Sequence, residues 1–508
     1  MRQSRLIISN AVVMWATQVL RLIPQLILVP FLIGTIGETG YGDYTLVWSL
    51  ITSIEGLHRS LQSGVVKYGA AYLAKDQIKE INQVVSSSFV FSLVLGVLAC
   101  LGIIGLSIFY GRFTTELGSS LIVVGLMVIF IFPLTPYIAI IQSKQRFYIG
   151  AIAETAWKYL TLLAVVLWFR ISTPSLVSLI VITSGLLVFS RLGQVPFAFR
   201  LVPGLKNRLS LFRKESYKMI ASFGGMTLLI SASLAVNSTG VRWLMGELVD
   251  NVFVAHLAIM LMPGIMVNKI IKAITITIMP ATSAYEAKGN LLALQRILKS
   301  GIRYTNLILV AGFPAAILLM RDLLVLWVGD EYAFLTPYTL LLFLGTAIRL
   351  SASTAHHMLK GLDEQKKVLA IYIMGLVVVP LVMILSIQYA TGNPYLASSL
   401  GLGTGFILSG LLQVYFGAKV LTFDLKNLAL KSFGEPLLPG LIIFPAVYWI
   451  ITHDPRFSFI TLILFSILSV IVYLGIFYFG FASLEERKQG MDILISIRTK
   501  VNGLRGKN

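Results

Sequence analysis

Long apolar runs recur from one end of the chain to the other, and they constrain its fold more than any other feature. Runs of about 18 or more predominantly apolar residues are typical of transmembrane helices. Charged residues make up 12% of the sequence and hydrophobic residues 57%, whereas an average soluble domain carries about 25% charged residues. A spanning segment must also satisfy its own backbone hydrogen bonds, which a helix does. The sequence therefore predicts an all-α polytopic membrane protein.

Fourteen membrane-spanning helices are predicted. The expected spans are 9–33, 41–68, 84–109, 119–143, 150–170, 175–197, 219–245, 252–278, 304–327, 335–359, 368–389, 395–417, 433–452 and 459–481. The first has a basic start but no small-residue cleavage site, so we expect it to be retained. An even number of spans puts both termini on one side, and 28 Lys and Arg residues fall on that side against 4 on the other. The positive-inside rule therefore predicts cytoplasmic N- and C-termini.

Several functional classes are disfavoured by the distribution of charge and by missing motifs. The formal net charge is +19, but most basic residues lie in short loops between apolar runs, which indicates helix orientation and not nucleic-acid binding. Cys100 is the only cysteine, which leaves no disulfide framework and no thiolate metal site. The sequence has no P-loop, HExxH or GxSxG motif. We therefore expect a protein that is not an enzyme and holds no cofactor.

An internal repeat suggests a division into two lobes. Four residues recur at a constant offset of 213, with Ala71, Tyr72, Ala74 and Lys75 matching Ala284, Tyr285, Ala287 and Lys288. Each set is expected to open a short amphipathic helix on the cytoplasmic surface. Transporters built from such repeats commonly bind substrate at the repeat interface. The expected organisation is 1–198 (N-lobe), 199–218 (basic linker), 219–418 (C-lobe), 419–482 (last two spans) and 483–508 (basic amphipathic tail on the membrane surface).

Five cations fall deep inside the predicted spans: Arg21, Arg59, Lys269, Lys272 and Arg349. Arg59 and Lys272 are themselves separated by the repeat offset of 213. Each such residue costs about 2.5 to 3.5 kcal/mol in the bilayer centre, so the five cannot all face lipid. They either pair with carboxylates or line a wet cavity. Because the spans offer few carboxylates, we expect a surplus of roughly +4 and an anion-binding cavity between the lobes.

Two further titratable residues lie beside Arg59. Glu55 precedes it at the i, i+4 spacing that favours an ion pair, and it could instead take part in coupling. His58 could carry a proton in H⁺-coupled transport, although we favour a histidine that is merely hydrogen-bonded between helices; coupling to H⁺ or Na⁺ stays open. The remaining intramembrane cations are interpreted as side chains that snorkel from helix ends, namely Lys67, Lys158, Arg191 and Arg242.

Four stretches resemble a known family. "GTIGETGYGDYTLVWSLITSIEGLHRSLQSGVVKYGAAYLAK" (34–75), "IQSKQRFYIGAIAETAWK" (141–158), "MPATSAYEAKGN" (279–290) and "LWVGDEYAF" (326–334) are similar to segments of the polysaccharide and O-antigen (Wzx-like) flippases of the multidrug/oligosaccharidyl-lipid/polysaccharide (MOP) exporter superfamily. A glycine-rich turn opens the second helix in that family, and Gly37, Tyr41, Gly42 and Tyr44 match it. Many relatives have an Asp in helix seven, where this chain reads "NSTGVRW" (237–243).

The resemblance implies a flippase that moves undecaprenyl-diphosphate-linked glycan across the bacterial cytoplasmic membrane. It would work among membrane lipids and beside a polysaccharide polymerase or ligase, with the deep cations meeting the diphosphate. Two other transporters remain alternatives: a flippase for a cell-wall lipid precursor and a MATE-type ion-coupled multidrug antiporter. An antiporter for cationic drugs should carry intramembrane carboxylates, and the first predicted helix has none.

Overall fold

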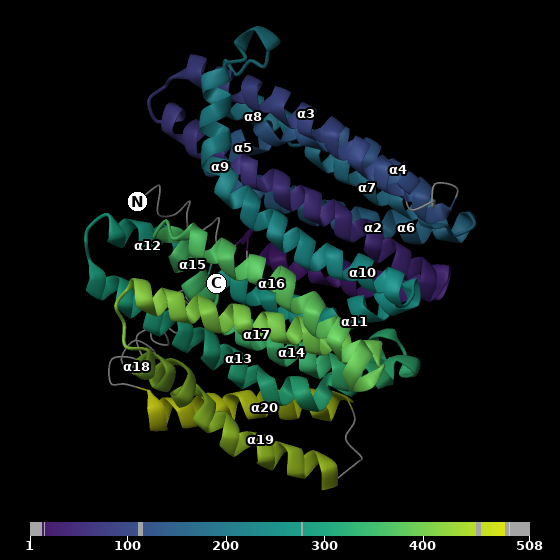
Figure 1. The fold of residues 1–508 in the computed structure, drawn as a ribbon, viewed down its shortest axis with the longest axis vertical. Coiled ribbons are helices and arrows are strands. Elements are labelled where there is room, and N and C mark those ends of the chain that lie inside the picture. Colours follow the sequence, from purple (N-terminus) through teal and green to yellow (C-terminus); the bar gives the residue numbers. More distant parts are fainter. Residues whose placement is uncertain are drawn as a thin grey trace, which may run out of the picture. The chain divides into compact units, whose positions relative to one another are not determined.

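The structure, a computed structural model, describes residues 13–14, 16–109, 115–275, 278–453, 459–482 and 487. Every helix and strand assignment in those residues is helical, which confirms the predicted fold class (Figure 1). The start of the first predicted span and the predicted amphipathic tail lie outside the described residues, apart from Arg487.

Eleven helices of the described chain are long and apolar enough to cross a membrane, or up to thirteen if each of two bent pairs is one span. One of the eleven, Ala16–Leu73, has 58 residues and would be about 87 Å long as a continuous helix, nearly three times the hydrocarbon thickness. It is broken at Gly37, whose φ of 73° and ψ of 174° are not helical. That break separates the first two predicted spans; the count of fourteen stays a prediction.

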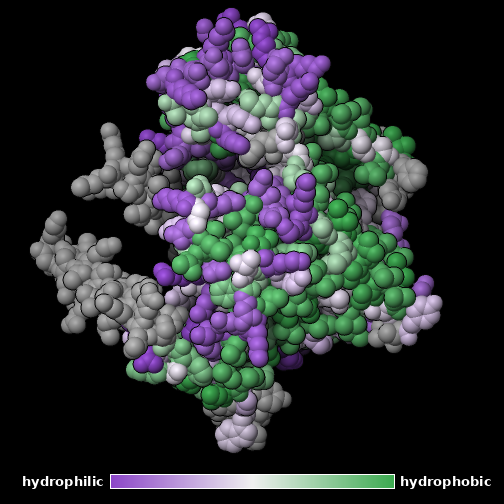
Figure 2. All heavy atoms as spheres, turned by 60° about the vertical axis from the view of Figure 1, so that its left-hand side comes forward, coloured by the Kyte–Doolittle hydropathy of each residue, from purple (hydrophilic) through white to green (hydrophobic). Residues whose placement is uncertain are grey.

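The surface carries many exposed apolar side chains. Leu98 is 58% exposed, Leu464 61% and Ile171 80%, and Figure 2 shows hydrophobic residues over broad areas of the face that it presents. In water such surfaces would drive association, whereas in a bilayer they face lipid. With its many apolar helices, the chain is a multi-pass membrane protein.

Two compact units make up the chain. The first comprises 1–276, 337–346 and 363–409. Its helices include α2 (Leu22–Leu73), α3 (Ile78–Phe109), α4 (Glu116–Ile131), η1 (Phe132–Leu134), α5 (Thr135–Ser143), α6 (Phe147–Ile171), α7 (Leu176–Leu192), α8 (Val195–Leu201), η2 (Leu209–Leu211), α9 (Lys214–Ala235), η3 (Val236–Gly240), α10 (Val241–Leu248), α11 (Asn251–Thr275), α16 (Gln365–Leu385) and η5 (Ser386–Thr391). It also takes the larger parts of α14 (Thr336–Ser351) and α17 (Pro394–Val420).

The second unit comprises 277–336, 347–362 and 410–508. Its helices include α12 (Ile278–Glu286), α13 (Leu291–Val328), η4 (Asp330–Leu335), α15 (Ser353–Gly361), α18 (Leu425–Ala429), η6 (Leu430–Gly434), α19 (Glu435–His453), α20 (Phe459–Ile476) and η7 (Phe477–Phe481). Arg303 of α13 is 5% exposed; it pairs with Glu435 and donates to the carbonyls of Lys431 and Phe481 at 2.9 Å. This buried arginine ties the long α13 to the last two helices. The two lobes predicted from the internal repeat are a separate division of the chain, and they stay a prediction.

The repeat offset recurs in the local backbone. Asp76 and Gly289, which are 213 residues apart, both have positive φ, at 53° and 63°. The turns around them make the same hydrogen bonds: the amide of Gln77 donates to Tyr72 O, and that of Asn290 to Tyr285 O. The prediction of a short surface helix in each segment is wrong, however. Each matching segment instead holds the end of one helix, this turn, and the first residues of α3 or α13.

Small residues allow close helix packing in the first unit. A Cβ atom on Gly345 would come within 2.9 Å of the Cα of Gly403 and 3.0 Å of its carbonyl oxygen, so only glycine fits there without a shift of the backbone. Small hydroxyl side chains join α2 to α9 and η3, with Ser60 Oγ 2.7 Å from Ser231 Oγ and Ser53 Oγ 2.6 Å from Thr239 Oγ1. Interfaces of this kind are typical of membrane helices, which pack through small and hydroxyl residues.

The glycine-rich turn allows α2 to pack closely against α11. A Cβ on Gly42 would lie 1.8 Å from the carbonyl oxygen of Asn251, a distance that excludes any side chain larger than hydrogen. Asn251 in turn donates from Nδ2 to Asp43 Oδ1 at 2.5 Å. The family-like motif therefore has a physical function here: Gly37 breaks the helix, and Gly42 lets two backbones meet.

Candidate functional site

A pocket of about 380 Å³ lies within the first unit. It is lined by α2, α6, α7, α10 and α11 through Pro24, Gln25, Leu28, Val29, Leu32, Tyr41, Tyr44, Thr45, Trp48, Ser49, Thr52, Trp157, Lys158, Thr161, Thr183, Arg242, Ala258, Met262, Ile265 and Lys269. The volume falls in the range of about 300 to 1,000 Å³ that is usual for small-molecule sites. Tyr41 and Tyr44 of the glycine-rich motif belong to the lining.

Three cations line the pocket, and each has a neutral partner. Lys269 Nζ donates to Gln25 Oε1 at 3.0 Å, Arg242 Nη1 donates to the carbonyl of Ser238 at 2.8 Å, and Lys158 Nζ lies 4.7 Å from the centre of the Trp157 ring. Among the residues that the structure describes, the lining contains no Asp or Glu, and no carboxylate lies within 4 Å of these three groups. The carboxylate of Glu154 acts on Lys158 and Lys269 only from beyond ion-pair distance, and a partly buried pocket with such a surplus of positive charge attracts anions.

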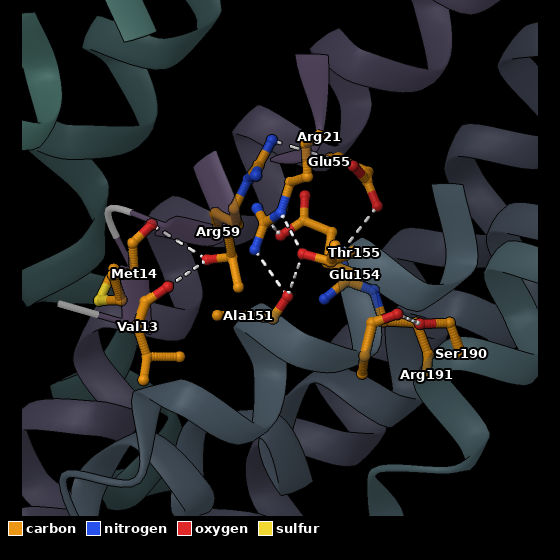
Figure 3. A network of polar contacts seen from close by, with 12 residues as sticks. Val13, Met14, Arg21, Glu55, Arg59, Ala151, Glu154, Thr155, Ser190 and Arg191 are labelled. Atoms are coloured by element: carbon orange, nitrogen blue, oxygen red, sulfur yellow. Dashed lines mark hydrogen bonds and ion pairs between the residues drawn. The ribbon is translucent and has the colours of Figure 1, made fainter. Parts of the chain in front are cut away.

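A second set of cations lies outside the lining and is paired. The guanidinium of Arg21 is buried and bonded on every side, as Figure 3 shows: Nη1 to Glu154 Oε2 at 2.7 Å, Nε to Thr155 Oγ1 at 3.0 Å and Nη2 to the carbonyl of Ala151 at 2.8 Å. All three partners are on α6. The arginine therefore links the first helix to α6, and its hydrogen bonds are made to protein groups and not to a ligand.

Glu55 has a different main partner from the one expected. Its Oε1 lies 3.1 Å from Arg191 Nη2, while its Oε2 lies 3.9 Å from Arg59 Nη2 (Figure 3). The first contact is a hydrogen-bonded ion pair between α2 and α7, and the second is a looser contact within α2. Glu55 holds Arg191 firmly and Arg59 weakly.

Arg59 and Lys272, the pair related by the repeat offset, are both exposed. The Arg59 side chain is 57% exposed. The charges of Arg59 and of Glu154 both act on the Lys272 ammonium group, so the two cations lie in one electrostatic neighbourhood. Neither belongs to the pocket lining.

His58 is bonded from both ring nitrogens. Nε2 lies 3.1 Å from Ser92 Oγ and Nδ1 2.9 Å from Thr135 Oγ1, and the ring stacks on Phe132 with centres 4.0 Å apart. The side chain is 5% exposed. This geometry suits a histidine that packs between α2, α3 and α5.

The predicted site residues therefore separate into groups. Lys269 lines the pocket, Arg21 is paired, and Arg59 and Lys272 are exposed nearby. Arg349 is half-buried in α14, in the part that belongs to the second unit, and its membership of the site stays a prediction.

Sequence reasoning missed three functional candidates by treating them as snorkelling side chains. Lys158 and Arg242 line the pocket and Arg191 pairs with Glu55, so for these three the interpretation was wrong. A signal was present for Lys158, because position 158 lies near the middle of the predicted span 150–170. Arg191 and Arg242 lie closer to span ends, and their partners come from helices that the sequence alone cannot bring together.

Comparisons with known proteins agree on the fold. No family model matches the sequence, and no curated protein matches it. Among solved structures, an inward-facing multidrug resistance MATE family transporter of the MOP superfamily has a TM-score of 0.66 at 13% identity, covering 81% of this chain and 98% of that one. The lipid II flippase MurJ, in an inward closed conformation, has a TM-score of 0.65 at 15% identity, covering 93% and 99%.

A third solved structure is a MOP superfamily transporter from Pyrococcus furiosus, with a TM-score of 0.62 at 14% identity, covering 81% of this chain and 95% of that one. It is described as having a binding pocket of reverse polarity that suggests a different function. At these identities the likeness concerns the fold. The chain has the fold of the transporters of the MOP superfamily.

Proposed function

We propose that the protein is a flippase for lipid-linked saccharide, with the first-unit pocket binding the diphosphate of its substrate. The observation that carries the proposal is the pocket itself: it presents Lys158, Arg242 and Lys269, and its described lining has no carboxylate. A diphosphate is an anion of matching sign, and a polyprenyl chain would stay in the bilayer while the head group crosses.

The arrangement suits transport because the cations are positioned but not neutralised. Gln25, Ser238 and Trp157 orient them without cancelling their charge. In a low-dielectric pocket such charge stabilises an anion more strongly than it would in water. A few cations bind a head group firmly enough to capture it and leave it able to dissociate on the other side. Cytoplasmic termini, the bacterial cytoplasmic membrane and association with a polymerase or ligase belong to the same proposal.

The charge of the pocket disfavours the drug-antiporter alternative, because a cationic drug would meet three cations there. The transporter from Pyrococcus furiosus offers a parallel, since the reversed polarity of its pocket is taken to suggest a different function. A flippase for a cell-wall lipid precursor is a second candidate. It is favoured by the share of this chain that the MurJ structure covers, 93% against 81% for the MATE transporter.

The test uses the purified protein in liposomes with a fluorescent prenyl-diphosphate-linked disaccharide, whose outward-facing fraction is bleached by dithionite. We expect the wild type to expose the inner-leaflet probe to bleaching. Lys158→Gln and Lys269→Gln should each slow this about ten-fold or more, since a hydrogen bond to a charged group contributes about 1.5 to 3 kcal/mol.

The matched control is Arg170→Gln, which removes an exposed cation from the same helix as Lys158. It should flip the probe at the wild-type rate. Flipping by Lys158→Gln and Lys269→Gln at that same rate would exclude the pocket as the diphosphate site. A probe bearing a peptide on its sugar separates the two flippase candidates, because only a cell-wall precursor flippase should prefer it.

A further inference from the structure

Four aromatic rings form one wall of the pocket, here called the aromatic wall: Tyr41, Tyr44 and Trp48 from α2 and Trp157 from α6. Successive ring centres lie 6.3, 5.9 and 6.0 Å apart, and the planes differ by 27°, 18° and 24°. The three α2 positions are spaced i, i+3 and i+7, which places them on one face of the helix. The result is a continuous run of nearly parallel rings.

Core packing accounts for part of this wall. Trp157 is 6% exposed, and its Nε1 donates to the carbonyl of Thr183 at 3.3 Å; Tyr41 is 3% exposed. Tyr44 and Trp48 are only half-buried and line the open pocket. Large amphipathic rings that remain open to a pocket are common where a ligand binds.

A buried hydroxyl beside the wall has no partner. Thr161 lies one turn beyond Trp157 on α6, lines the pocket and is 6% exposed, yet its Oγ1 makes no hydrogen bond to any described residue. The other serine and threonine hydroxyls of the lining each donate to a backbone carbonyl, as Thr45 does to Gly42 and Thr183 to Leu179. A buried polar group without a partner is costly. Because Oγ1 is itself covered, a polar ligand in the pocket would supply that partner after a rotation of the Thr161 side chain.

These features together match the chemistry of a pyranose ring attached to a phosphate. A sugar has a face of C–H groups that stacks on aromatic rings and an edge of hydroxyls that can bond Thr161. Lys158 stands over the Trp157 ring, so a cation lies at the same wall where the phosphate would begin. A prenyl tail offers Thr161 no hydrogen bond, and a bare diphosphate has no face to stack.

We propose that the aromatic wall and Thr161 form a subsite for the first sugar of the substrate, so that the pocket selects saccharide-bearing lipid diphosphates over bare ones. This inference rests on the proposed function. The cations would bind both kinds of lipid, and the wall would distinguish them. Selection at this point prevents unloaded carrier lipid from being flipped in place of substrate.

The test measures the affinity of two matched probes, farnesyl diphosphate and farnesyl-diphospho-N-acetylglucosamine, for the full-length protein in lipid nanodiscs. The wild type should bind the sugar-bearing probe about ten-fold more tightly. Trp48→Leu and Thr161→Val should lower that preference several-fold, because each should weaken binding of the sugar-bearing probe more than binding of farnesyl diphosphate. Trp48→Phe keeps a ring and should keep much of the preference, and Trp168→Leu, at an exposed tryptophan of α6, should change neither affinity.

Each other outcome has a definite meaning. Equal affinity of the wild type for both probes, or an undiminished preference in both Trp48→Leu and Thr161→Val, would overturn the sugar subsite and leave the diphosphate site standing. If the wild type binds neither probe, the proposed function fails and the subsite falls with it. Thr161→Val removes a hydroxyl that bonds no described residue, so it keeps the test valid if Trp48→Leu does not fold.

Discussion

Two groups of basic residues in the first unit differ in their partners. Arg21 and Arg191 are bonded to Glu154 and Glu55 at 2.7 and 3.1 Å, whereas the cations of the pocket have neutral partners and no carboxylate within 4 Å in the described chain. Both groups lie inside predicted spans, so a position within a span does not by itself identify a binding residue. The partner does: a paired cation holds helices together, and a cation with a neutral partner keeps its charge for a ligand.

The largest expected effect reverses charge in the pocket. Lys158→Glu should abolish flipping in the liposome assay, with a loss of more than about 100-fold, because it replaces an attraction for the diphosphate with a repulsion. Lys158→Arg should retain most activity, since it keeps the charge. Protein abundance should stay normal in both variants. If Lys158→Glu flips the probe at more than a tenth of the wild-type rate, the cations of the pocket are not the ones that bind the substrate.

Breaking the paired group should destabilise the protein. Arg21→Met leaves Glu154 without its main partner and should cost about 2 to 3 kcal/mol, below the range for a fully buried pair because the Glu154 side chain is 41% exposed. The measurement is the midpoint of denaturant unfolding in detergent. The double variant Arg21→Met with Glu154→Met should recover most of the lost stability. If the double variant is as unstable as the single variant, the ion pair with Glu154 is not the source of the stability that Arg21 provides.

Gly42→Ala tests the scaffold of the pocket. Its Cβ would lie 1.8 Å from the Asn251 carbonyl oxygen, so α2, which carries three rings of the aromatic wall, and α11, which carries Lys269, must move apart. We expect a loss of about 1 to 3 kcal/mol and slower flipping. Gly56→Ala, on the same helix with open space around it, should be nearly neutral in both measurements, and an equal effect of the two substitutions would argue against the close contact.

The smallest effect is expected at Arg59. Its contact with Glu55 is 3.9 Å long and its side chain 57% exposed, so Arg59→Gln should change the unfolding free energy by less than about 1 kcal/mol. Arg59 and Lys272 can attract the anionic substrate at long range, so Arg59→Gln should flip a few-fold more slowly than the wild type at low salt. That difference should disappear as ionic strength rises, because salt screens the attraction in the wild type. Salt-independent loss of flipping would instead indicate direct contact with substrate.

The sequence predicted the fold class because apolar runs of this length have one solution in a bilayer. It also located Arg21, Glu55 and Lys269 as residues that need partners. It could not predict which partner each would take, because Glu154, Arg191 and Gln25 lie on other helices, at separations set by packing. The repeat marked two segments that share a turn, at Asp76 and Gly289. The sequence predicted a short helix in each segment instead, which was wrong, since local hydrophobic periodicity does not show where a long helix begins.

The most direct test of the central claim compares two probes that share one tail and carry opposite charge. Farnesyl diphosphate and farnesyl-trimethylammonium are titrated into the purified wild-type protein and into the Lys158→Gln, Lys269→Gln double variant. The account predicts saturable binding of the diphosphate by the wild type, a loss of about 100-fold in the double variant, and no saturable binding of the ammonium probe. Tighter binding of the ammonium probe by the wild type would contradict it.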